Sequence, residues 1–146
     1  SLGGIVAALL RHLSTQWRTA RTKGKMMKAL QWIEKYWHIL SLCIFLAITT
    51  LSLRPLDNFP SVAGSDKTHH LIAYAVLVFP VALRKPDRWM WFVLLFIGYG
   101  GLIELVQPYV NRYGEWLDML ANTAGVTCGV ALAAVVRTLR NRLIKA

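Results

Sequence analysis

Charged side chains are scarce in this chain of 146 residues, and acidic ones are the scarcest. Charged residues make up 16% of the sequence, against about 25% in a typical soluble domain, while 55% of the residues are hydrophobic. The chain has 17 Lys and Arg but only 7 Asp and Glu, so its net charge is +10. The length allows one domain. A basic and apolar chain is either a nucleic-acid-binding protein or a membrane protein with basic loops, and the positions of the charges decide which.

Cysteine is rare as well, with two residues, Cys43 and Cys128, each inside an apolar run. Two isolated cysteines have neither the spacing of a disulfide framework nor that of a zinc site. In apolar surroundings a thiol behaves as a small hydrophobic group. We therefore expect two buried and unreactive thiols, no metal site and no cofactor.

Long apolar segments are what the chain does have. A membrane-spanning helix needs about 20 mainly apolar residues. Four candidates lie at residues 37–53, 69–83, 89–106 and 117–136. Proline cannot continue a helix interior, so Pro55 and Pro108 mark the ends of the first and third segments. The sequence predicts an all-α membrane protein with four transmembrane helices rather than a soluble helical bundle with a very apolar core.

Basic residues fall mostly on one side of this predicted bundle. Seven precede the first span, three lie between the second and third, and four follow the last, which makes 14. The other side has the remaining three, Arg54, Lys67 and Arg112. The positive-inside rule therefore predicts that both termini are cytoplasmic. Topology and anionic lipid account for the basic charge, so no nucleic-acid partner is expected.

Residues 1–36 form a basic amphipathic segment ahead of the spans. Its apolar residues recur at three- and four-residue steps, which places them on one helix face; they are Leu2, Ile5, Val6, Leu9, Leu10, Leu13 and Trp17. A basic amphipathic helix is typical of a segment that lies on a membrane surface. Alternatively, Met26 or Met27 is the natural start and residues 1–25 are an added or misread extension. Residues 137–146 form a basic cytoplasmic tail.

Polar residues near the spans gather at the predicted outer ends. They are Asp66, Lys67, His70, Tyr74, Glu104, Gln107, Arg112, Asp118 and Asn122. Asp66, His70 and Tyr74 are spaced i, i+4, i+8 and share one helix face, as do Glu104 with Gln107 and Asp118 with Asn122. A charged side chain within a membrane is costly unless it is paired or hydrated, so these faces should point into the bundle. The sequence predicts an outward-facing polar pocket.

Three roles for this polar cluster stay open. It could be a salt-bridge network in which Lys67 and Arg112 pair with the carboxylates and fix the bundle. It could bind a lipid headgroup or an envelope precursor. It could also be catalytic, with His70 and Glu104 as acid and base, although no nucleophile motif or complete metal-ligand set accompanies them.

Small residues predict close helix packing beside the cluster. Ala121, Gly125 and Gly129 recur at four-residue steps, a pattern that lets helix backbones approach each other in membranes. Gly101 and its glycine neighbours predict a similar face on the third span.

The order of these residues resembles the VanZ-like family. The family pattern starts with Asp-Lys-x-x-His and a tyrosine four residues on, continues with Gly-x-x-Glu-x-x-Gln and an arginine, and ends with Asp-x-x-x-Asn-x-x-Gly. The matching residues are Asp66, Lys67, His70 and Tyr74, then Gly101, Glu104, Gln107 and Arg112, and finally Asp118, Asn122 and Gly125. The resemblance covers residues 37–136 and leaves residues 1–36 outside. Gly114-Glu115 departs from an aromatic-Ser pair.

The resemblance implies a multi-pass protein of the bacterial inner membrane, in a family named for low-level resistance to teicoplanin. It supports the fold and the pocket more than any reaction. The favoured function is binding of a lipid headgroup or envelope precursor in the outward-facing pocket, with membrane lipids as partners. One alternative is a non-catalytic accessory subunit that contacts other membrane protein subunits. A second alternative is a membrane-embedded hydrolase or transferase, although a non-enzymatic role is preferred.

Overall fold

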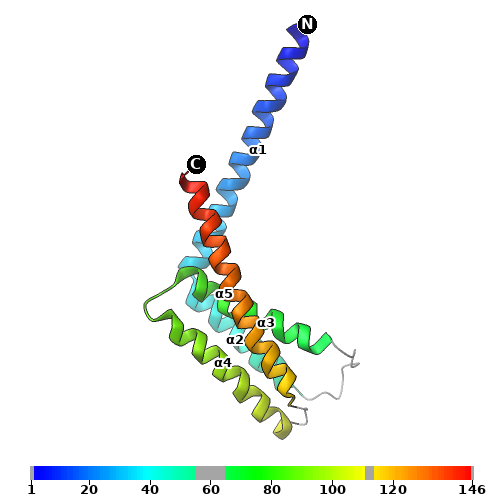
Figure 1. The fold of residues 1–146 in the computed structure, drawn as a ribbon, viewed down its shortest axis with the longest axis vertical. Helices are drawn as coiled ribbons and strands as arrows, with labels where there is room; N and C mark the ends of the chain where they lie inside the picture. Colours follow the sequence, from blue (N-terminus) through cyan, green and yellow to red (C-terminus); the bar gives the residue numbers. More distant parts are fainter. Residues whose placement is uncertain (1, 55–64, 111–113, 146) are drawn as a thin grey trace. The chain divides into compact units, whose positions relative to one another are not determined.

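The computed structural model describes residues 2–54, 65–110 and 114–145, and these ranges are helical apart from short turns (Figure 1). The elements are α1 (Leu2–Lys35), α2 (Trp37–Ser52), α3 (Ser65–Arg84), α4 (Trp89–Val106), the short 3-10 helix η1 (Gln107–Val110) and α5 (Trp116–Lys145). The predicted all-α class is confirmed for the part of the chain described.

The chain divides into two units, residues 1–33 and residues 34–146. The first unit is helical and continues through Gly24, where the apolar repeat of the sequence ends. Its polar side chains bond locally, as when the hydroxyl groups of Ser14 and Thr15 donate to the carbonyl of Arg11. The side chains of Leu9, Leu13 and Trp17, on the predicted apolar face, lie outside the described residues.

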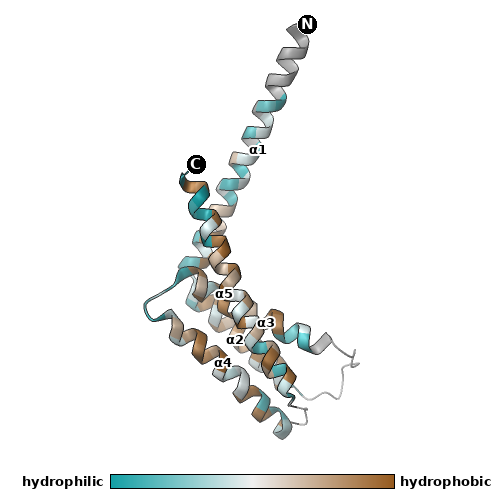
Figure 2. Ribbon diagram, in the orientation of Figure 1, coloured by the Kyte–Doolittle hydropathy of each residue, from teal (hydrophilic) through white to brown (hydrophobic). Residues whose placement is uncertain are grey.

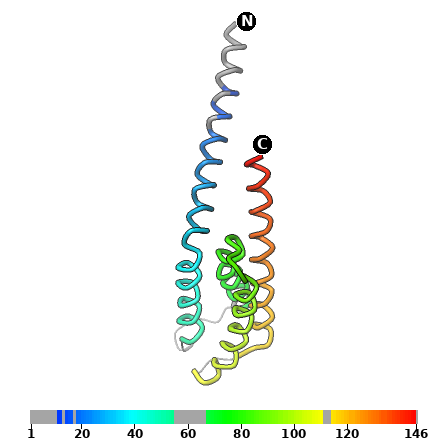
Figure 3. The backbone as a smooth tube through the Cα atoms, turned by 90° about the vertical axis from the view of Figure 1, so that its left-hand side faces the viewer, coloured from blue at the N-terminus to red at the C-terminus, as the bar shows by residue number. Residues whose placement is uncertain are grey.

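The second unit is a helical bundle centred on α3, which packs against α2, α4 and α5. Its buried core contains Tyr74, Leu77 and Val78 from α3, together with Phe96 from α4 and Val126 from α5. Helices α2 and α4 run toward one end of the bundle, and α3 and α5 run away from it (Figures 1 and 3). The ends of α2 and α4 therefore meet the starts of α3 and α5.

The bundle exposes apolar side chains and buries polar ones. Apolar residues colour much of α4 and α5 in Figure 2, and Leu42, Leu94 and Leu102 are each more than half exposed. By contrast, Gln107 and Asn122 are each only 1% exposed. Soluble monomers rarely present such a contiguous apolar surface, whereas a helix surrounded by lipid does so at no cost. This distribution is that of a membrane protein.

The two cysteines also lie on the exposed apolar surface, so the prediction that both thiols are buried was wrong. Cys43 and Cys128 are both exposed at the surface of the bundle rather than buried. The apolar runs that contain them face outward, because lipid tails solvate apolar side chains as well as a protein core does.

The number of spans is only partly as predicted. By length and composition, two of the described helical segments could cross a membrane, Trp89–Val110 and Trp116–Lys145. Ser14–Lys35 and Trp37–Ser52 pass the same test only together, as a broken span or a re-entrant loop. Helix α2 alone has 16 residues, fewer than the roughly 20 that a span needs, and the first two turns of α3 are polar.

Two glycines of α5 bring its backbone directly onto α3. A Cβ atom at Gly125 would overlap the backbone of Leu71, and one at Gly129 would overlap Ala75 and Val78. The small-residue face predicted on α5 is therefore used against α3, while Ala121 beside it is only half-buried. Gly101 is different, since a Cβ there meets only Met119, at an ordinary 3.4 Å.

We predict that Gly125→Ala destabilises the bundle by about 1–3 kcal/mol, because the added methyl group overpacks a backbone contact. Gly98→Ala is the matched control on α4, since a Cβ at Gly98 meets no atom within 4 Å. Thermal unfolding of both variants in detergent measures the effect. Equal unfolding temperatures for the two variants would show that α3 and α5 are not in backbone contact.

Candidate functional site

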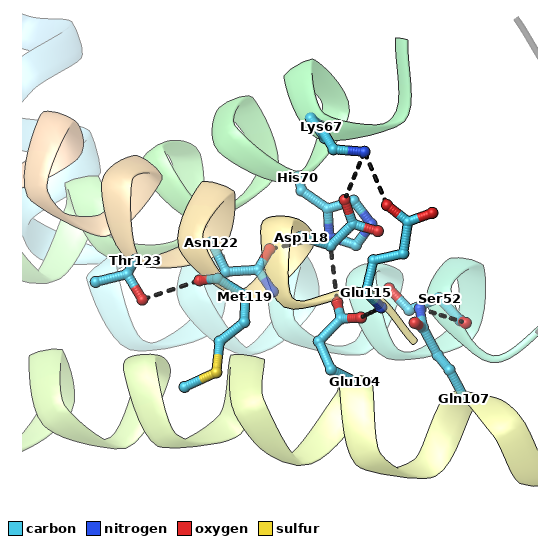
Figure 4. Close-up of polar contacts among 10 residues, drawn as sticks. All are labelled: Ser52, Lys67, His70, Glu104, Gln107, Glu115, Asp118, Met119, Asn122 and Thr123. Carbon is cyan, nitrogen blue, oxygen red and sulfur yellow. Dashed lines mark hydrogen bonds and ion pairs between the residues drawn. The ribbon is translucent and has the colours of Figure 1, made fainter. Parts of the chain in front are cut away.

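Five polar side chains from three helices meet at the end of the bundle where α3 and α5 begin and α4 ends (Figure 4). They define what we call the polar cluster: Lys67, His70, Glu104, Asp118 and Asn122. Four of them are buried, with residue exposures of 8% for His70 and Glu104, 3% for Asp118 and 1% for Asn122. The helical spacing of Lys67 and His70 and of Asp118 and Asn122 explains why each pair faces the same way.

His70 occupies the middle of the polar cluster. Its Nδ1–H donates a hydrogen bond of 2.9 Å to the Oδ1 atom of Asn122. The same nitrogen lies 3.9 Å from Oε1 of Glu104, within ion-pair distance but too far for a hydrogen bond. One imidazole thus links α3 to α5 and lies beside the carboxylate of α4.

Lys67 supplies the cationic side chain of the cluster. Its Nζ atom lies 2.9 Å from Oε2 of Glu115 and 3.8 Å from Oδ1 of Asp118. The Lys67–Glu115 pair is half-exposed, so by itself it contributes little stability. Asp118 is buried in the first turn of α5, where the positive end of the helix dipole also favours a carboxylate.

Glu104 is held by the chain that follows it. The backbone N–H of Glu115 donates to Oε2 of Glu104 at 3.2 Å. A Cβ atom at Gly114 would collide with the backbone carbonyl of Glu104. The Gly114-Glu115 segment can therefore lie directly over the end of α4 because residue 114 has no side chain.

Gln107 and Tyr74 flank the polar cluster. The Nε2 atom of Gln107 donates to the backbone carbonyl of Ser52 at 3.4 Å, which connects η1 to the end of α2. The Tyr74 ring lies near Asn122, since a Cβ at Gly100 would be 3.1 Å from Asn122 Cβ and 3.3 Å from Tyr74 Cε1. Both residues are only 1% exposed.

Several buried polar atoms have no hydrogen-bond partner among the residues that the structure describes. They are the Tyr74 hydroxyl, Glu104 Oε1, Gln107 Oε1 and Asn122 Nδ2. Buried polar groups in native proteins nearly always have a partner, and leaving one unsatisfied costs about 1–3 kcal/mol. A concentration of such atoms around one histidine indicates a place where a ligand, an ion or water binds.

An apolar pocket of about 560 Å³ opens beside the cluster, between the end of α4 and the start of α5. Its apolar wall includes Leu102, Leu105, Pro108, Trp116 and Met119. Glu104 and Glu115 supply its acidic edge. A smaller pocket of about 140 Å³ lies on the side of His70 that faces α2.

Sequence reasoning missed Glu115 and the apolar pocket. Glu115 lies where the chain departs from the family's aromatic-Ser pair, and that departure was the one signal that could have identified it. The pocket left no signal, because its wall comes from ordinary apolar positions on two helices. Asp66 and Arg112, both predicted members of the cluster, have side chains outside the described residues.

The cluster could bind a cation or exchange a proton. His70, Glu104 and Asp118 each offer one possible metal-ligand atom, and these three atoms lie within 4.8 Å of one another. Their positions in the sequence form no metal-binding spacing, and the packing of α3, α4 and α5 brings them together. His70 and Glu104 also have the residue types of an acid–base pair.

Comparison with known proteins gives one result for this chain. A family model described as VanZ/LLP1 matches residues 2–137. The match begins well before residue 37, where the resemblance read from the motifs began. A search of curated proteins gave no match, and neither did a search of solved structures.

Proposed function

The chain belongs to the VanZ/LLP1 family, and from this premise we propose that it binds a lipid headgroup or lipid-linked envelope precursor at the outer face of the bacterial inner membrane. The observation that carries this proposal is the apolar pocket, which shares Glu104 with the polar cluster. An amphiphilic molecule needs both surfaces side by side, one for its apolar chain and one for its polar group.

The proposal includes four spans with both termini in the cytoplasm. Helices α2 and α3 pack in the same bundle as the two helices that are long and apolar enough to cross, and Leu46 on α2 and Ile72 on α3 are exposed like lipid-facing residues. Of the 17 basic residues, 14 fall on the side that the positive-inside rule assigns to the cytoplasm. In the same scheme, residues 1–36 lie on the membrane surface as a basic amphipathic helix.

The dimensions of the pocket suit part of a lipid chain. Ligand pockets of about 300–1,000 Å³ typically enclose drug-sized molecules in mainly apolar walls with a few polar groups, and a volume of about 560 Å³ falls in that range. Among the described residues, the unpartnered atoms in and beside the cluster include acceptors at Glu104 and Gln107 and donors at Tyr74 and Asn122. A headgroup rich in hydroxyl or amino groups could satisfy both kinds.

A catalytic role is the second candidate, since His70 and Glu104 are 3.9 Å apart and buried. A hydrolase or transferase would act on the molecule that the pocket holds. A catalytic protein would chemically alter the bound molecule, whereas a binding protein would leave it unchanged.

Labelling of single cysteines tests the orientation. In a background with Cys43→Ser and Cys128→Ser, we predict that an impermeant maleimide labels Tyr109→Cys in intact cells and leaves Asp87→Cys unlabelled. Both positions are exposed in the structure, so a difference in labelling reports the side of the membrane. Labelling of Asp87→Cys with none at Tyr109→Cys would reverse the proposed topology.

Lipid retention tests the pocket. We predict that protein extracted in mild detergent carries a lipid-class molecule in native mass spectra, and that Gly98→Leu lowers its retention by about tenfold, equivalent to about 1.4 kcal/mol. Gly98 lines the pocket, and a Cβ atom there meets no atom within 4 Å, so we expect the leucine side chain to take up space in the pocket. Ala47→Leu, an exposed position on α2, is the matched control.

Two further variants separate binding from structure. Normal folding of Glu104→Gln and His70→Ala with lost retention and altered teicoplanin susceptibility supports the binding function, whereas loss of folded protein in both assigns the cluster to a structural network. Equal lipid retention by Gly98→Leu and Ala47→Leu would refute the pocket. A stoichiometric protein partner in place of lipid would instead favour an accessory subunit.

A further inference from the structure

We propose that His70, Glu104 and Asp118 form a binding site for one divalent transition-metal ion, such as Zn²⁺ or Mn²⁺. One ligand-type atom from each residue lies within 4.8 Å of the other two, and all three residues are buried. The three come from α3, α4 and α5, and their side chains lie close together in Figure 4. The inference concerns the ion alone and does not depend on the lipid.

The donor set determines which ions fit. One imidazole nitrogen with two carboxylate oxygens suits zinc and the neighbouring first-row metals, whereas Mg²⁺ and Ca²⁺ favour sites made only of oxygen. Three protein ligands also leave at least one coordination position open, as in zinc sites that bind a water molecule or a substrate. The open coordination position of the ion could therefore be taken by a water molecule or by another exchangeable ligand.

Metal binding requires the three side chains to close around the ion. Zinc bonds to nitrogen and carboxylate oxygen are about 2.0–2.2 Å long, so ligand atoms around a tetrahedral zinc ion are roughly 3.4 Å apart. The observed limit of 4.8 Å exceeds this by roughly 1.4 Å, and rotations of Glu104 and Asp118 about their side-chain bonds would have to supply that movement.

Asn122 has the position of a supporting residue for a metal ligand. A metal-ligating histidine almost always donates its other ring N–H to an oxygen atom, which fixes the ring and its tautomer. His70 makes such a bond, from Nδ1 to the Oδ1 atom of Asn122 at 2.9 Å. Its Nε2 atom then keeps the lone pair that a metal ion requires. Because Nδ1 is the ring nitrogen that lies 3.9 Å from Glu104, binding through Nε2 also requires the ring to shift toward the ion.

The charge of the cluster favours a cation. Glu104 and Asp118 are both carboxylates with residue exposures of 8% and 3%, and buried charges need compensation. Lys67 pairs with Glu115 and Asp118, whereas Glu104 has no cation of its own beside it among the described residues and is compensated by the Glu115 N–H, the His70 ring and the Asn122 amide. Oε1 of Glu104 has no hydrogen-bond partner among the described residues. A bound ion would neutralise the charge of this carboxylate.

Metal binding to the untagged, chelator-treated protein in detergent tests the inference. Titration calorimetry with ZnCl₂ and MnCl₂ should give one site per chain. Either ion should also raise the unfolding temperature in thermal unfolding, since an ion that binds only the folded state stabilises it. MgCl₂ and CaCl₂ should bind more weakly. Glu104→Gln and Asp118→Asn should each lower the affinity by at least about tenfold, and Asn122→Ala by about 10–100-fold.

One substitution beside the site is a matched control. His69→Ala removes the exposed imidazole next to His70 and should not change the affinity. Gly98→Leu should keep the ion even where it loses lipid, so the two proposals can fail separately.

Several results would overturn the metal site. They are the absence of saturable binding, binding that survives both carboxylate substitutions, or binding that His69→Ala removes. If the carboxylate variants do not fold, X-ray absorption of the zinc-loaded wild-type protein decides. Imidazole and oxygen donors support the site, and sulfur donors from Cys43 or Cys128 contradict it.

Discussion

Lipid tails form no hydrogen bonds, so each polar group that enters a membrane-embedded bundle has to be satisfied within the protein. The arrangement of residues 34–146 follows from this constraint. Leucines cover the outside of α4, while Gln107, Asp118 and Asn122 are nearly inaccessible. Among the described residues, His70, Glu104, Asp118 and Asn122 lie at the same end of their helices, so the polar cluster forms where α3 and α5 begin and α4 ends.

Close packing and the polar cluster depend on the same helix contact. Gly125 lets α5 lie against the backbone of α3, and Asn122 is three residues earlier on the same helix face. Only at this separation can the Asn122 amide accept a hydrogen bond of 2.9 Å from His70. The small residues of α5 are thus part of the site although none of them carries a functional group.

The two buried carboxylates of the cluster differ in how well their charge is compensated. This difference favours a binding site over a purely structural network. Asp118 has Lys67 nearby and the start of a helix beneath it, so its charge is well balanced. Glu104 has a backbone N–H and an imidazole 3.9 Å away, and it also forms part of the edge of the apolar pocket. A partner from outside the chain would bind most favourably at Glu104.

The sequence by itself determined the properties that belong to single helices. Length and apolarity predicted the helical class, and spacings such as that of Asp118 and Asn122 predicted which side chains share a face. The tertiary structure decided which faces meet: Lys67 pairs with Glu115, Gly125 packs on α3 rather than on another helix, and Cys43 faces outward. It also brought His70, Glu104 and Asp118 within 4.8 Å of one another. Periodicity fixes the direction of a side chain about its own helix axis, whereas distances between helices depend on how the backbones pack.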